Sequence, residues 1–141
     1  MEDDLFLSQQ HPYSRRWAII EDDGTTGWLY LTAPDSTKPV AHCWLYNRIK
    51  APAGRIFGRG DTPIVPADFL VDSAPFPAPP ATSVHFRWTH DGQGVAVLLD
   101  KVLVGYIAKP GGSGYSKNLK SSGPYGSPLD YSAYTQVFGE G

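Results

Sequence analysis

The segment from residue 84 to 108 carries the pattern that most limits how this chain can fold. It contains three short apolar stretches and two groups of turn-forming residues: 84–88, 95–99 and 102–108, with turns at 90–93 and 100–101. In the first stretch Val84, Phe86 and Trp88 alternate with polar residues, and this period of two places them on one face of a strand. Connections this short join antiparallel neighbours, so the segment predicts a three-stranded antiparallel meander.

Three further strands are predicted in the N-terminal half. They cover residues 16–21, 27–31 and 40–49, and the turn formers Asp22-Asp23-Gly24 and Pro34-Asp35-Ser36 separate them. The stretch from Val40 to Ile49 places Val40, His42, Trp44 and Tyr46 on one face and Ala41, Cys43 and Leu45 on the other. Because both faces are largely apolar, we expect this strand to lie at the centre of a sheet.

The remaining segments are rich in residues that interrupt regular structure. Seven prolines between residues 50 and 82 predict an extended surface connection, with one short helix from Pro66 to Ser73. Residues 109–128 form a Gly/Ser-rich loop, in which Tyr115, Leu119 and Tyr125 favour packing on the body over a free linker. A short terminal helix that opens at Ser127-Pro128 is favoured over a last strand, and residues 1–14 are expected to be flexible.

The sequence therefore predicts one mainly β domain over residues 1–141. We expect about six strands in an antiparallel β-sandwich or a strongly curled sheet, with one or two short helices. The 15 Gly and 13 Pro residues agree with short strands joined by many turns.

Charge and cysteine content bound the partners and the compartment. The net charge is −2, and no cluster of basic residues is denser than Arg15-Arg16, so we expect no nucleic-acid partner. No apolar run approaches the ~20 residues of a membrane span, and we expect neither a signal peptide nor a membrane. Cys43 has no second cysteine to pair with, which is typical of a reducing, cytoplasmic environment.

Catalytic motifs are weak throughout the chain. His42 adjoins Cys43, but adjacent side chains on a strand point to opposite faces, so this pair does not form a nucleophile and its base. The four histidines lack the spacing of a metal site, and Gly111 to Lys117 lacks the ending of a phosphate-binding loop. We therefore predict no cofactor and no metal; a small hydrolase that uses His85 or His90 with an Asp stays as an alternative.

Aromatic residues are the side chains in this sequence best suited to bind a partner. The chain has four Trp, eight Tyr and six Phe, and several tyrosines lie in the Gly-rich C-terminal part. Exposed tyrosines on such loops are typical of protein-binding surfaces. The predicted partner contacts, all placed in loops, are Asp22, Asp23, Arg59, Asp61, Tyr115, Lys117 and Tyr125.

Four segments in order resemble an uncharacterised family of small bacterial β-rich proteins, of the kind encoded beside toxins as immunity proteins. They are Gly27-Trp28-Leu29-Tyr30, Trp44-Leu45-Tyr46-Asn47, Trp88-Thr89-His90-Asp91-Gly92 and Gly114-Tyr115-Ser116-Lys117-Asn118-Leu119. The resemblance implies a non-enzymatic protein that neutralises a cognate toxin. A small-ligand or carbohydrate-binding domain, with aromatic rings stacked on a sugar, is the second hypothesis. Homodimerisation through an uncovered sheet edge is also open.

Overall fold

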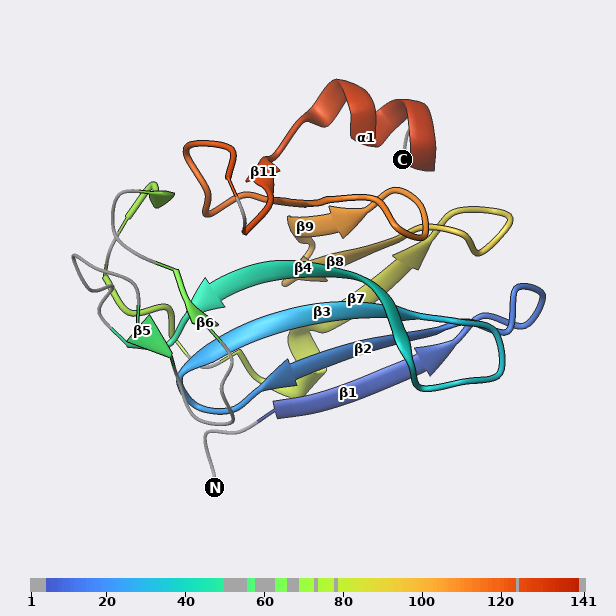
Figure 1. The fold of residues 1–141 in the computed structure, drawn as a ribbon, viewed down its shortest axis with the longest axis horizontal. Coiled ribbons are helices and arrows are strands. Elements are labelled where there is room, and N and C mark those ends of the chain that lie inside the picture. Colours follow the sequence, from blue (N-terminus) through green and yellow to red (C-terminus); the bar gives the residue numbers. More distant parts are fainter. Residues whose placement is uncertain are drawn as a thin grey trace.

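Two β-sheets packed face to face form the body of the protein in the computed structural model (Figure 1). The structure describes residues 5–49, 56–57, 63–65, 69–72, 74–77, 79–123 and 125–139. The two sheets and one short helix at the C-terminal end confirm the mainly β, sandwich-like fold that the alternating pattern predicts.

The first sheet is a four-stranded antiparallel meander in the order β1-β2-β3-β4. Its strands are β1 (Leu5–Gln10), β2 (Trp17–Asp22), β3 (Thr26–Thr32) and β4 (Pro39–Asn47). The last three confirm the strands predicted at 16–21, 27–31 and 40–49. β1 lies within the segment expected to be flexible; it pairs with β2 along its whole length, from Leu5↔Asp22 to Gln10↔Trp17.

The second sheet has the order β11-β10-β9-β8-β7. Its strands are β7 (Val84–Trp88), β8 (Val95–Leu99), β9 (Val102–Ile107), β10 (Gly114–Ser116) and β11 (Ser127–Pro128). β7, β8 and β9 pair antiparallel in succession and confirm the predicted meander. A 3₁₀ turn (Ala81–Ser83) precedes β7, and β5 (Ile56–Phe57) pairs with β6 (Pro63–Ile64) apart from the two main sheets.

Apolar side chains from both sheets meet in one central core. Ile20, Leu29, Cys43, Val97 and Val104 belong to it, and each is buried. On the other face of the first sheet, a second cluster is built around Trp28 and Trp44. Strands β3 and β4 are thus covered on both faces. The expectation that residues 40–49 form a central strand is wrong, because β4 is the last strand in the order β1-β2-β3-β4; its second apolar face packs in the Trp28–Trp44 cluster instead.

Two glycines let the second sheet approach β4 closely. A Cβ atom at Gly114 would lie 2.5 Å from the Cβ of Cys43, and one at Gly105 would lie 2.9 Å from Cδ2 of Leu45. Asn118 closes the contact by donating from Nδ2 to the carbonyl of Leu45 at 2.7 Å. Larger residues at either glycine would separate the sheets along β4.

A break in register at the end of β4 changes the predicted face of Tyr46. Gly27 pairs with Tyr46 and Trp28 pairs with Trp44, so Leu45 has no partner of its own across from it. The prediction that Tyr46 shares a face with Trp44 is therefore wrong, because a bulge interrupts the alternation of side chains. Tyr46 instead joins the central core and stacks on Phe76, with ring centroids 4.6 Å apart.

The C-terminal segment forms the predicted helix, α1 (Tyr131–Phe138), which covers the outer face of the second sheet. Its N-cap is Asp130, whose Oδ1 accepts from the amide of Ala133 at 3.0 Å. Ser127 and Pro128, the predicted opening of the helix, pair with β10 instead.

The predictions for the two irregular segments, residues 50–82 and 109–128, can be compared with the described residues. Most of the helix predicted from Pro66 to Ser73 lies outside the described residues; within this stretch Leu70 forms an isolated bridge with Leu119. Residues 109–123 and 125–128 pack on the body, as predicted, and both Leu119 and Tyr125 are buried.

Candidate functional site

Four turns gather at one end of the sandwich and form what we call the turn surface (Figure 1). They are the connections β1–β2, β3–β4, β7–β8 and β9–β10, at residues 11–16, 33–38, 89–94 and 108–113. Hydrogen bonds link neighbouring turns: the Asp35 amide donates to the Arg15 carbonyl at 2.7 Å, and the Arg16 Nε donates to Gln93 Oε1 at 3.0 Å. Loops held at one end of a rigid sandwich are a common location of binding residues.

His11 organises the β1–β2 turn from inside. The imidazole is buried, and its Nδ1 accepts from the amides of Tyr13 and Ser14, each at 3.2 Å. The ring lies against Trp88 of the opposite sheet, with centroids 5.2 Å apart. Gly92 makes room for it: the backbone there has a φ of +70°, and a Cβ atom would come within 2.4 Å of Nδ1. His11 thus acts as a structural anchor for the turn.

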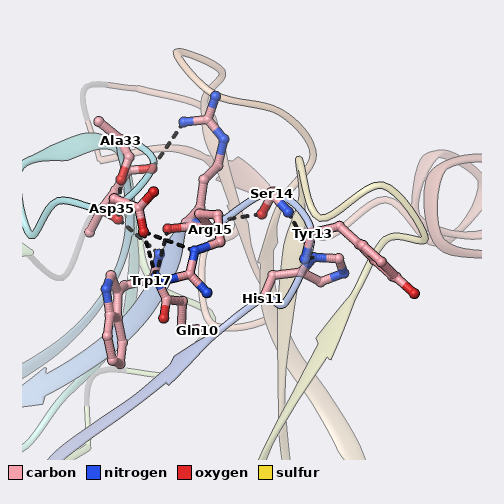
Figure 2. Close-up of polar contacts among 10 residues, drawn as sticks. Gln10, His11, Tyr13, Ser14, Arg15, Trp17, Ala33 and Asp35 are labelled. Atoms are coloured by element: carbon pink, nitrogen blue, oxygen red, sulfur yellow. Dashed lines mark hydrogen bonds and ion pairs between the residues drawn. The ribbon is translucent and has the colours of Figure 1, made fainter.

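Arg15 and Asp35 join the β1–β2 and β3–β4 turns at the surface (Figure 2). The Arg15 Nε contacts Asp35 Oδ1 at 2.9 Å, and the two side chains keep 52% and 62% of their exposure. Both residues have a positive φ, 64° for Arg15 and 53° for Asp35, a conformation that side-chain-bearing residues seldom adopt. Gln10 supports this conformation at Arg15, because its Nε2 donates to the Arg15 carbonyl at 3.0 Å.

Tyr13 is the most exposed large aromatic side chain of the turn surface. The residue is 82% exposed, and its ring extends away from the Arg15–Asp35 contacts (Figure 2). Tyrosine and arginine are the residue types most enriched, with tryptophan, among those that dominate binding energy at protein interfaces. Since hydrogen bonds hold the backbone of this turn, Tyr13 can contact a partner at little cost in ordering.

Asp91 adds a fixed negative charge at the rim of the same surface. Its carboxylate accepts from Thr89 Oγ1 at 2.7 Å and from the Gln93 amide at 3.0 Å. The Thr89 hydrogen bond, followed by that from Gln93, lowers the pKa of Asp91 below its ordinary value. Asp91 is therefore ionised at neutral pH.

Two of the predicted contact residues, Asp22 and Asp23, lie at the end of β2 that is farther from the turn surface. The prediction that Asp22 is exposed is wrong: its carboxylate is fully buried and accepts from Tyr46 Oη and Arg48 Nη1, each at 2.9 Å. Asp23 is half-buried, and its Oδ1 accepts from the amides of Thr25 at 2.8 Å and Thr26 at 3.1 Å. Both carboxylates thus hold the β2–β3 turn together.

The three predicted contacts in the C-terminal part of the chain, Tyr115, Lys117 and Tyr125, differ in their exposure to solvent. Tyr125 was predicted to be exposed and is buried against Phe69, because the Gly-rich loop folds onto the Trp28–Trp44 cluster. Tyr115 is half-buried and stacks on Tyr106, with centroids 4.7 Å apart. Lys117 is exposed as expected. Arg59 and Asp61 lie outside the described residues.

Sequence reasoning missed Tyr13, Arg15 and Asp35. A usable signal was present, because the apolar run Leu5-Phe6-Leu7 is followed, after four intervening residues, by the turn formers Pro12 and Ser14. The polar residues between these two groups concealed the strand, and with it the turn.

The groups considered for catalysis are not assembled into a catalytic site in the part of the chain that the structure describes. Cys43 is completely buried while His42 is exposed on the other face of β4, as predicted. Burial raises the pKa of the Cys43 thiol to about 12, so it is protonated and unreactive at neutral pH. No hydrogen bond joins His85 or His90 to a carboxylate among the described residues, and no group of His, Cys, Asp and Glu there is suited to hold a metal.

Two hollows in the described surface offer little to a small ligand. One, of about 240 Å³, lies between the start of β4 and the Gly-rich loop, and is smaller than the roughly 300–1,000 Å³ of common ligand sites. The other, of about 780 Å³, runs beside α1, where Arg87 already donates to Tyr134 Oη and to the Phe138 carbonyl. The four tryptophans are buried or half-buried, which leaves none as an open platform for a sugar ring.

Comparison of the chain with protein-family models gave no match. Searches of curated proteins and of solved structures likewise found no similar protein. In the described part of the chain, no helix has the length and apolar character that crossing a membrane requires.

Proposed function

We propose that this protein is a protein-binding module without catalytic activity of its own, and that its partner binds at the turn surface. The observation that carries the proposal is the exposed Tyr13 side chain on a turn that His11 anchors from within and that the Arg15–Asp35 pair links to the β3–β4 turn. An exposed aromatic residue next to an arginine on a preorganised backbone is typical of binding hot spots.

The resemblance to immunity-type proteins suggests the class of partner. In its specific form the proposal is that the protein is a bacterial, cytoplasmic immunity protein that neutralises a cognate toxin by contact. The buried Cys43 thiol and the separated histidines support binding over chemistry as the mechanism of neutralisation. Lys117, which is exposed, remains a predicted contact outside the turn surface.

A pull-down of the tagged protein from lysate of its own source cells, read by mass spectrometry, tests the proposal. Three bait proteins are compared: the native chain, the double variant Tyr13→Ala/Arg15→Ala, and Tyr131→Ala. Tyr131 is a matched control, because it is 58% exposed but lies on α1, away from the turn surface. We expect one stoichiometric partner that is lost from the double variant and kept by Tyr131→Ala.

The partner is then expressed alone and together with this protein. A partner whose expression arrests growth, and whose toxicity disappears on co-expression, supports the immunity role. A partner retained by Tyr13→Ala/Arg15→Ala at native affinity would place the binding surface elsewhere and refute the assignment.

A further inference from the structure

The hollow of about 240 Å³ beside β4 lies at the border of the turn surface. One wall is the start of β4, from Val40 to His42, and the other includes residues 111–114. The β3–β4 turn directly precedes the first wall, and the β9–β10 turn supplies most of the second, so the hollow is continuous with two of the four turns. Its volume, below that of common ligand sites, suits one side chain of a partner better than a whole small molecule.

The lining of this hollow can donate hydrogen bonds to an anion. Its described lining residues include no Asp and no Glu, while His42 and Ser113 are both exposed. Neither the amide nor the hydroxyl of Ser113 makes a hydrogen bond within the described part of the chain. The Gly111 amide donates to the Val40 carbonyl at 3.1 Å and thereby holds the turn against β4. Free N–H and O–H donors on a fixed backbone are the groups that bind an anionic oxygen.

Two lysines flank the hollow, one from each of the adjoining turns. Lys109 lies along its rim: a Cβ atom at Gly112 would be 3.2 Å from Lys109 Cγ and 3.8 Å from its Cε. Lys38 is the last residue of the β3–β4 turn. Both lysines are exposed, and within the described residues neither forms an ion pair. The one carboxylate in these two turns, Asp35, is bound to Arg15, so both ammonium groups are available to an external anion.

The turn surface as a whole is positive on a negative chain. Its four turns hold four basic and two acidic residues, a net charge of +2, whereas the whole chain has −2; these residues are Arg15, Arg16, Lys38 and Lys109, with Asp35 and Asp91. Pairing of Arg15 with Asp35 leaves three basic residues against one acidic residue. A partner with an acidic face is therefore attracted to this end of the molecule and repelled by the remainder.

We infer that the partner bound at the turn surface presents an acidic segment, and that one of its Asp or Glu carboxylates enters this hollow. In the complex Ser113 and His42 donate to the carboxylate, and the ammonium groups of Lys38 and Lys109 balance its charge. A nucleic-acid strand is disfavoured as the source of the anion, because the net charge of the chain is negative. The inference rests on the proposed protein-binding function and adds the chemistry of the partner's contact face.

Titration of the ¹⁵N-labelled protein with the peptide hexaglutamate, followed by two-dimensional NMR, tests the inference without the natural partner. We expect the amide signals of His42, Gly111, Gly112 and Ser113 to shift as the peptide is added. Hexaglutamine, which has the same length and no charge, should leave these signals in place. The concentration dependence of the shifts gives the affinity for the acidic peptide.

Two double variants with the same change in net charge separate this site from general attraction. Lys38→Gln/Lys109→Gln should bind hexaglutamate about tenfold more weakly, because two opposing charges are removed from the rim of the hollow. Lys101→Gln/Lys120→Gln should keep the native affinity, since both lysines are exposed but lie outside the turn surface. Ser113→Asp, which adds a carboxylate to the lining, should also weaken binding. The NMR spectrum of each variant shows whether it is folded.

Three results of the titration would overturn the inference. They are hexaglutamate shifts that leave the hollow unaffected, equal weakening by the two lysine variants, and tighter binding of hexathymidylate, which would assign the hollow to nucleic acid. The pull-down separates this inference from the proposed function. A partner that Lys38→Gln/Lys109→Gln retains at native affinity, and that Tyr13→Ala/Arg15→Ala loses, would refute the acidic contact and leave the protein-binding role in place.

Discussion

Replacing Asp22 with alanine should destabilise the fold strongly. The carboxylate of Asp22 is fully buried and accepts from the Tyr46 hydroxyl, Arg48 Nη1 and the Gly24 amide, at 2.9, 2.9 and 2.8 Å. The Arg48 side chain is itself only 9% exposed. Removing one member of a buried ion pair costs about 3–5 kcal/mol, and the slight exposure of Arg48 favours the lower end, about 3 kcal/mol. For a chain of this length that corresponds to a fall in Tm of ~10 °C.

Urea denaturation followed by tryptophan fluorescence measures the change in the free energy of unfolding. Asp23→Ala is the matched control: it removes a neighbouring carboxylate that is half-buried and bonds only backbone amides, at an expected cost of about 1 kcal/mol. A double-mutant cycle with Tyr46→Phe should show that this second substitution, costly in the native chain, has little further effect in the Asp22→Ala background. Equal losses from Asp22→Ala and Asp23→Ala would refute the reasoning that a buried ion pair holds this turn.

Three further predictions concern single sites. Gly92→Ala should lower the affinity for the partner and the thermal stability together, because the new Cβ collides with His11 and the backbone φ is +70°; calorimetry measures both, and an unchanged Tm contradicts the prediction. Cys43 should react with a thiol reagent such as DTNB only after denaturation, since burial raises the pKa of its thiol to about 12; rapid labelling of the native protein at neutral pH would contradict this. Thr89→Val should raise the pKa of Asp91 toward the ordinary value, as followed by NMR titration, because the Thr89 hydroxyl is the main cause of its lowering. In the native chain the lowered pKa means that the stabilisation from Asp91 is present above its unfolded pKa, near pH 4, and is lost as the pH falls through the folded value.

Local pattern was sufficient to predict the strands that form the two meanders. Alternation between residues 84 and 108 identifies β7, β8 and β9, and the two apolar faces of residues 40–49 identify a strand that is covered on both faces, although β4 lies at the end of its sheet and not at the centre. These signals are local because each strand buries its own alternate residues and the connecting turns are short. The bulge at Leu45 is different, since nothing in the sequence separates it from continuous alternation.

The burial of polar residues depended on distant partners and could not be predicted from the sequence. Asp22 occupies a turn-forming sequence, where aspartate is usually solvated, yet Arg48 and Tyr46 reach it from more than twenty positions away. Tyr125 lies in a Gly-rich segment that is typical of mobile loops. It is buried because this segment folds onto the Trp28–Trp44 cluster and Tyr125 packs against its apolar side chains. For the same reason the turn surface was not predicted, since its four turns meet only after both sheets have formed.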